Sequence, residues 1–216
     1  MATFKMKSLT EDEIRSNLER FYELIDKYIS SPRKEKLTQF YNSIELTLAT
    51  SPASSKISHH NCFAGGYVDH VIRVTEAALV FDKVWDRFNQ QKDYTTEELV
   101  FSAINHDLGK LGTNDQPFYQ PNDETWQIEK QGTFYKYNKS IPHMRIADRS
   151  LYALQEAGIA VNETEFLAIK LHDGLYEEAN KPYYITYSSD FEIKTNLVYI
   201  LHQADLMASR VEKQIK

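Results

Sequence analysis

The stretch Ala103-Ile-Asn-His106-Asp107-Leu-Gly109-Lys110 ends an apolar helical segment with two side chains of metal-binding type. A histidine and an aspartate are costly to bury unless they are paired or bound to something. A neutral imidazole and a carboxylate are good ligands for a borderline divalent ion, and adjacent positions near a helix end can aim both at one point. Taken alone, the stretch fits a capping aspartate beside a surface histidine equally well.

Two other polar residues fall on apolar helical faces elsewhere in the chain. His70 lies on the apolar stripe of the helix expected after Gly65-Gly66. Asp205 shares one face of a later helix with Leu201 and Ala208. An unpaired carboxylate there would cost several kcal/mol, so we expect Asp205 to have a cationic partner. A lysine, an arginine or a helix N-terminus would satisfy it as well as a metal ion would.

The remaining sequence favours helix after helix. Thr10 with Glu13, and Thr95 with Glu98, can each form a capping box, which marks a helix start. Glycines such as Gly158 stand where helices are expected to stop. Helices are therefore expected around residues 10–29, 32–48, 66–81, 95–109, 143–157 and 163–173, and from 189 toward the C-terminus.

Two segments break the helical pattern. Residues 117–140 carry apolar and aromatic side chains around Lys130-Gln131-Gly132, which predicts a short β-hairpin. Those side chains are Trp126, Ile128, Phe134, Tyr135 and Tyr137. Residues 181–188 predict an aromatic loop. The expected fold class is all-α, a helical bundle with a small β-hairpin insertion near residues 117–140.

The composition restricts the partners. The chain of 216 residues is 42% hydrophobic and has one cysteine, which suits a single globular domain without an intramolecular disulfide. No run of about 18 apolar residues is present, so we expect a cytoplasmic protein without a membrane anchor. The formal charge of −6 disfavours long nucleic acid and favours a small ligand over a polymer. Whether the chain forms a homo-oligomer is left open.

In its histidine and aspartate pattern the sequence resembles the HD-domain metal-dependent phosphohydrolases. Their pattern is a histidine on one helix, an adjacent His-Asp on a later helix and an aspartate on a late helix. His70, His106-Asp107 and Asp205 match it in order, although Leu108 replaces the commoner isoleucine. Residues 51–70 are also similar to the segment before the first metal helix in bacterial 3′-to-5′ exoribonucleases. The resemblance covers about residues 50–212 and leaves the N-terminal helices at 10–49 unassigned.

The resemblance implies a centre of one or two divalent ions. One ion would be held by His70, His106, Asp107 and Asp205, and a second by His143, His172 and a bridging Asp107. Two ions about 3.5–4 Å apart can activate a hydroxide and neutralise phosphoryl oxygens. Mixed nitrogen and oxygen ligands suit Mn, Fe, Co or Ni, whereas Mg prefers oxygen.

Lys110 would stabilise charge on the phosphoryl group, and its position favours residues 106–107 over the second His-Asp pair at 172–173 as the bridging pair. We expect substrate contacts from His60, Arg145, Arg149, Trp126 and Tyr135. Each has an ordinary alternative, namely a loop histidine, a surface arginine or packing of the hairpin on the helical body.

The implied activity is hydrolysis of a phosphoester of a nucleotide, either a mono- or a triphosphate, by a metal-bound hydroxide. One alternative is a phosphodiesterase acting on cyclic or linear dinucleotides, or as a 3′-to-5′ exonuclease. The other is a non-catalytic nucleotide sensor.

Overall fold

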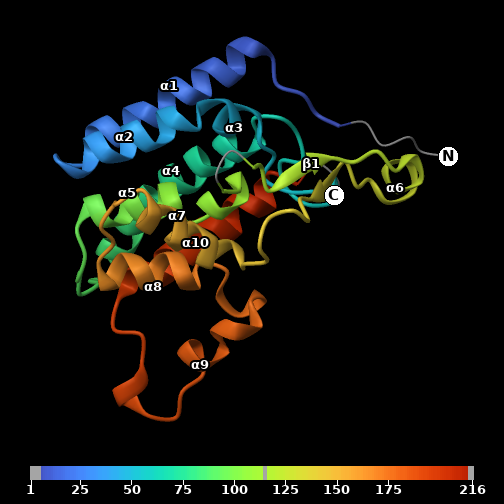
Figure 1. Ribbon diagram of the computed structural model, residues 1–216. Helices are drawn as coiled ribbons and strands as arrows, with labels where there is room; N and C mark the ends of the chain where they lie inside the picture. Colours follow the sequence, from blue (N-terminus) through green and yellow to red (C-terminus); the bar gives the residue numbers. More distant parts are fainter. Residues whose placement is uncertain (1–5, 114–115, 214–216) are drawn as a thin grey trace.

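The computed structural model describes residues 6–113 and 116–213, and these are mostly helical. The mainly-α fold class is therefore confirmed at that level (Figure 1). In chain order the helices are α1 (Glu11–Tyr28), α2 (Arg33–Ser43), α3 (Glu45–Thr50), α4 (Gly66–Arg87), α5 (Thr96–Asn105), α6 (Thr125–Gln131), α7 (Ile146–Glu156), α8 (Glu163–Leu171), α9 (Lys181–Tyr184) and α10 (Asn196–Val211). Short 3₁₀ turns lie at Leu108–Leu111, Gly174–Tyr176, Glu178–Asn180 and Ser189–Phe191.

The long helix α4 lies at the centre of the bundle. It packs against α5, α10 and α1, while α8 packs against both α5 and α10. Two groups of buried apolar residues hold these helices together. One joins α1 and α2 to α4 and α5 through residues such as Phe21 and Phe101, and the other joins α4, α5, α8 and α10 through residues such as Val74 and Leu201. The apolar faces of α4 and α5 are thus covered on two sides.

Side-chain caps fix where several helices begin. Thr10 and Glu13 form the expected capping box of α1, and Thr95 and Glu98 form that of α5. Each box satisfies backbone N–H groups that the first turn of a helix leaves without partners. These starts are confirmed as predicted.

Several boundaries differ from the sequence prediction. The helix expected over 32–48 is divided at Ile44 into α2 and α3, and the helix expected to reach residue 109 ends at Asn105. The last helix begins at Asn196 under a Thr195 cap rather than at residue 189, because residues 189–191 form a separate 3₁₀ turn. Residues 181–184 form the short helix α9 within the expected aromatic loop.

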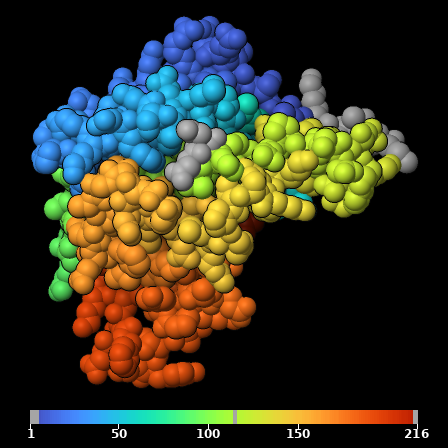
Figure 2. All heavy atoms as spheres, viewed as in Figure 1, coloured from blue at the N-terminus to red at the C-terminus, as the bar shows by residue number. Residues whose placement is uncertain are grey.

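The predicted hairpin segment pairs as an antiparallel sheet, but only at its ends. Strand β1 (Tyr119–Pro121) pairs with β2 (Tyr135–Tyr137), with Tyr119 opposite Tyr137. Between the strands the chain forms α6, so Trp126 lies on a helix, 55% exposed, and not on a strand. The segment projects from the helical body, as does the segment that contains α9 (Figures 1 and 2).

The N-terminal helices are bound to the rest of the bundle by an ion-pair network as well as by apolar contacts. Arg33 at the start of α2 donates to Glu97 of α5 and to the fully buried Glu165 of α8, each at 2.6 Å. Within the described residues, the structure contains no helix whose length and apolar character would suffice to cross a membrane.

Candidate metal centre

Side chains from four helices meet at one point in the bundle. His70 lies in the second turn of α4, and Asp205 lies in the middle of α10. His106 is the C-cap residue that follows α5, with Asp107 directly after it, and His172 is the C-cap residue that follows α8. Polar residues at helix ends can turn inward without interrupting the helical hydrogen bonds. The bundle therefore brings together residues separated by up to 135 positions in the chain.

The ligand atoms of this cluster lie within a few ångströms of one another. Nε2 of His70 is 3.2 Å from Oδ1 of Asp205 and 3.5 Å from Oδ2 of Asp107. Nε2 of His106 is 3.4 Å from Oδ2 of Asp107, and Nε2 of His172 is 3.7 Å from its Oδ1. Asp107 thus faces three imidazoles, as the sequence analysis expects of a bridging residue.

Backbone carbonyls fix which nitrogen of each histidine faces the cluster. Nδ1 of His106 lies 2.7 Å from the carbonyl of Ala103, and Nδ1 of His172 lies 2.8 Å from that of Ile169. A carbonyl accepts only from an N–H, so Nδ1 carries a proton, and Nε2 is the nitrogen at which a metal ion would take the place of a proton. This is how metal-binding histidines are commonly oriented.

Two buried nitrogens of the cluster indicate that it fits a metal ion. The Nε2 atoms of His70 and His106 are buried and have no hydrogen-bond partner among the described residues. Such atoms are costly in a protein interior unless something binds them. Among the described residues, groups that could hold a metal ion are His70 with His106 and Asp205, His106 with Asp107 and His172, His172 with Asp173 and Asp205, and His60 with His70 and Glu212.

The electrostatics of the cluster favour bound positive charge. Burial lowers the pKa of His172, but the carboxylates of Asp173 and Asp107 outweigh burial and raise that pKa to about 10. Burial raises the pKa of Asp107, but Lys110 and His106 outweigh it and hold the pKa of Asp107 well below its usual range. The carboxylates thus attract cations strongly, and a divalent ion on the imidazole nitrogens would satisfy them.

The expected catalytic residues are Asp107 and Lys110, and of these two Lys110 is not a metal ligand. Its Nζ lies 2.6 Å from Oδ2 of Asp107, and its side chain is 13% exposed. The 3₁₀ turn that carries Lys110 begins directly after Asp107, which holds the two side chains on one side of the chain. The ammonium group therefore lies at the edge of the cluster.

Glu212 is a buried partner of the cluster that the sequence analysis does not include. Its Oε2 lies 2.9 Å from Nδ1 of His70 and 3.0 Å from Nδ1 of His60, and its Oε1 accepts from Nε of Arg73 at 2.9 Å. A carboxylate on Nδ1 orients the ring and makes Nε2 a stronger ligand. Glu212 follows Asp205 by seven residues, which places both on one helical face, and this spacing is the signal that could have identified it.

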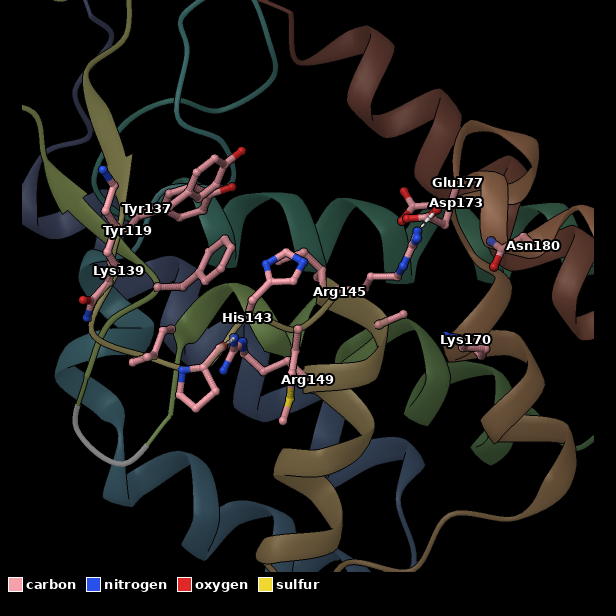
Figure 3. A pocket seen from close by; sticks show the side chains of 17 residues that line it. Tyr119, Tyr137, Lys139, His143, Arg145, Arg149, Lys170, Asp173, Glu177 and Asn180 are labelled. Atoms are coloured by element: carbon pink, nitrogen blue, oxygen red, sulfur yellow. Dashed lines mark hydrogen bonds and ion pairs between the residues drawn. The ribbon is translucent and has the colours of Figure 1, made fainter.

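His143 is not brought into the cluster. It is exposed, precedes α7 and does not belong to any of the metal-binding groups of the described residues. Its ring lies in a neighbouring cavity together with Arg145 (Figure 3). The histidines that lie together in the structure therefore differ from the set predicted from their order along the chain.

The residues expected to contact substrate lie in different surroundings. His60 is beside the cluster, bonded to Glu212. Arg145 is exposed and forms an ion pair with Glu177, whereas Arg149 is 1% exposed, donates to the carbonyl of Pro142 and lies over the ring of Phe118. Both arginines line the same cavity. Tyr135 lines a cavity, and Trp126 lines none of those formed by the described residues around the cluster.

One cavity is lined by residues of the cluster, and two others share lining residues with that cavity. The metal cleft, of about 280 Å³, is lined by Asp107, Lys110, His172 and Asp205 among others. The Phe118 cavity, of about 650 Å³, lies between the β1–β2 ribbon and the segment at Asp173–Asn180, with His143 and Arg145 between them (Figure 3). The Gln120 cavity, of about 700 Å³, is lined by residues that include Gln120 and Tyr135. The metal cleft is thus open to solvent-filled space large enough for a substrate.

Comparison of the chain with models of protein families, with curated proteins and with solved structures found no match. The arrangement of the cluster is therefore the basis for assigning a function.

Proposed function

We propose that this protein is a metal-dependent phosphohydrolase of the HD-domain type, which cleaves a phosphoester of a nucleotide. One observation carries the proposal. Three imidazole Nε2 atoms and two carboxylates converge beside a lysine. Both carboxylates, the lysine and His172 line an open cleft. Buried imidazole nitrogens without a hydrogen-bond partner favour metal binding. A lysine beside them suits an anionic substrate such as a phosphate ester.

The residues divide into two ligand groups that share the centre. His70, His106, Asp107 and Asp205 would hold one divalent ion, and His172 with Asp107 would contribute to a second. When bound, such ions activate a water molecule and neutralise phosphoryl oxygens. Mixed imidazole and carboxylate ligands favour Mn²⁺, Fe²⁺, Co²⁺ or Ni²⁺ over Mg²⁺.

The chain's own residues position and stabilise the phosphoryl group. Asp107 holds the ammonium group of Lys110 at the cleft, where it would face a non-bridging oxygen of the substrate. The Nδ1 contacts of His70, His106 and His172 hold the rings in place before substrate arrives. Groups oriented in advance do not need to reorganise during the reaction, and this is a large part of electrostatic catalysis.

The test is metal-dependent hydrolysis by purified protein. After treatment with EDTA, the protein should hydrolyse p-nitrophenyl phosphate or its bis-ester only when Mn²⁺ or a related ion is restored. Asp107→Ala should lose both metal and activity while keeping its helical circular dichroism, because Asp107 contacts each ligand group. The exposed Asp190 lies outside the three cavities, so Asp190→Ala is the matched control. Wild-type metal content in folded Asp107→Ala would refute the proposal.

A further inference from the structure

Arg149 is a buried cation whose hydrogen-bonding capacity is not fully used. It is 1% exposed, and its Nε has no hydrogen-bond partner among the described residues. Its Nη2 donates to the carbonyl of Pro142, and its guanidinium group lies over the ring of Phe118. The N–H groups of a guanidinium lie in its plane, so a ring on one face leaves them free for an acceptor. Burial lowers the pKa of Arg149, and a buried charge of this kind is costly unless an anion binds it.

The carboxylates that line the Phe118 cavity together with Arg149 are held by other partners. Glu177 forms an ion pair with Arg145, which Figure 3 shows at one side of the cavity. Asp173 lies 3.6 Å from Nε2 of His172, at the edge of the metal cluster. Among the described residues of this cavity, neither carboxylate therefore balances the charge of Arg149.

The first turn of α7 meets the same cavity. Ile146 and Ala147, the first two residues of α7, line it, and Arg149 follows in the same turn. Among the described residues no side chain caps α7, whereas α1, α5 and α8 each begin with a capping box. The carboxylate of Asp148 in this turn pairs with Lys170 of α8 instead. Uncapped N–H groups at a helix start carry partial positive charge and bind anions.

We propose that the Phe118 cavity contains a site for a phosphate group, bound by the guanidinium group of Arg149 and by backbone N–H groups at the start of α7. None of these groups belongs to the metal cluster, so the site binds its anion with or without a metal ion. The inference therefore stands independently of the proposed function. The phosphate group belongs either to inorganic phosphate or to a larger phosphate monoester, and both present the same kind of oxygen acceptors.

The arrangement of donors suits a tetrahedral oxyanion better than a planar carboxylate. Guanidinium N–H groups lie in one plane, whereas the N–H groups of a helix start point along the helix axis. A phosphate group has enough oxygens to accept from both directions, while a carboxylate that pairs with a guanidinium uses both of its oxygens. The site also adjoins the metal cleft, because Ile146 and Asp173 line both cavities.

The first experiment measures binding of inorganic phosphate to the full chain by isothermal titration calorimetry, once with Mn²⁺ and once in EDTA. Wild-type protein should bind phosphate in both conditions, because a metal centre contributes only in the first. Arg149→Gln should weaken the binding in EDTA about tenfold or more, since a hydrogen bond between charged groups contributes at least about that factor. Arg149→Lys should lose less, because it keeps the charge without the planar donor group. Arg20→Gln is the matched control, because Arg20 is an exposed arginine of α1 outside the three cavities.

The second experiment tests the helix start while Arg149 stays in place. Proline is tolerated at the first position of a helix, where it removes one N–H group. Arg145, the residue before it, has φ −66° and ψ 151°, a conformation that is allowed before proline. Ile146→Pro should therefore keep its helical circular dichroism and weaken phosphate binding in EDTA about two- to tenfold, the usual effect of one lost hydrogen bond.

The outcomes decide the inference without any measurement of hydrolysis. Absence of phosphate binding in EDTA, or wild-type affinity in folded Arg149→Gln, would overturn it, and so would acetate bound as tightly as phosphate. If Arg149→Gln does not fold, wild-type affinity in Ile146→Pro overturns the inference, and weakened binding supports it. Phenyl phosphate distinguishes the two sources, because tighter binding than that of inorganic phosphate identifies a monoester and weaker binding identifies the free ion.

Discussion

At the scale of single residues, Glu212 holds together three groups that surround the centre. Its carboxylate lies within 3.0 Å of His60, His70 and Arg73, and it is 8% exposed. Burial raises the pKa of Glu212, but His70 and His60 outweigh it and lower that pKa to about 2. The carboxylate is therefore ionised under ordinary conditions and keeps His70 turned toward the cluster.

Glu212→Ala should therefore weaken Mn²⁺ binding by about 10- to 100-fold, the usual effect of removing a carboxylate that orients a metal-binding histidine. Glu212→Gln should lose less, because the amide oxygen still accepts from Nδ1 of His70. Competition with a fluorescent chelator measures both affinities. An affinity for Mn²⁺ unchanged in Glu212→Ala would show that His70 does not need this partner or does not bind the ion.

Asp82 is a second residue for which local contacts predict a measurable effect, far from the cluster. It accepts hydrogen bonds from Lys92 and from the hydroxyl of Tyr94, each at 2.6 Å, and is 6% exposed. Burial raises the pKa of Asp82, but these hydrogen bonds outweigh it and place the pKa below the ordinary value of 3.8. Its ionised form is thus favoured by folding.

Asp82→Ala should lower the free energy of unfolding by about 1–3 kcal/mol at neutral pH. The variant removes the acceptor 2.6 Å from the Tyr94 hydroxyl and leaves that hydroxyl only the longer contact with Gln90, at 3.3 Å. The folded pKa is lowered, so this contribution is fully present above pH 3.8 and is lost as the pH falls through the folded pKa. Urea unfolding at several pH values measures the difference between wild type and variant. A difference that grows below pH 3.8 would contradict this assignment.

At the scale of elements, the turn after α5 is fixed by its contact with α7. The backbone N–H of Gly109 donates to the hydroxyl of Ser150 at 2.8 Å, and that hydroxyl donates to the carbonyl of His106 at 2.9 Å. A Cβ on Gly109 would lie 2.3 Å from the carbonyl oxygen of Ile146. Asp107 and Lys110 are therefore placed by the close approach of two elements.

Gly109→Ala should destabilise the protein by about 1–3 kcal/mol, since α7 must move away from the turn. Mn²⁺ affinity should fall as well, because the displaced turn carries Asp107. Thermal unfolding and metal titration measure the two effects. Gly158→Ala is the matched control, because a Cβ there meets nothing within 4 Å and only the left-handed backbone opposes it. Equal effects of the two substitutions would argue against the close approach.

The elements also show what sequence patterns can and cannot predict. Capping boxes placed α1 and α5 correctly, because a cap depends on residues three positions apart. The aromatic residues around Trp126 predict a hairpin because such residues favour strands. Each strand has only three residues, however, and the chain between the strands is helical. The side-chain alternation that identifies a strand repeats every two residues and cannot be recognised over only three residues. The sequence pattern therefore could not separate the strands from α6.

The same limit applies to the cluster. His70, His106, Asp107 and Asp205 could be identified because polar residues on apolar helical faces are unusual. The resemblance implies His143 and His172 only through their order along the chain, and order does not determine which side of the bundle a helix end faces. His172 meets Asp107, whereas His143 faces the Phe118 cavity. That distinction is a property of tertiary packing.

At the scale of the whole molecule, a metal ion at the centre would connect α4, α5, α8 and α10. An ion that binds only the folded chain stabilises it by about 2.7 kcal/mol at a concentration 100 times its Kd. The melting temperature of the wild type should therefore rise on addition of Mn²⁺ and return in excess EDTA, while Asp107→Ala should not respond. Differential scanning calorimetry measures the shift. An equal rise in Asp107→Ala would place the stabilising ion elsewhere.

The position of α10 in the chain has a consequence for protein synthesis. His70 and Glu212 are separated by 142 residues, and Asp205 also belongs to α10. N-terminal elements leave the ribosome first and begin to fold there. A nascent chain that already exposes His70, His106 and His172 therefore still lacks the carboxylates of α10. The centre is assembled only after residues 205–212 have emerged, so a ribosome that stalls before that point carries a chain without the complete set of ligands.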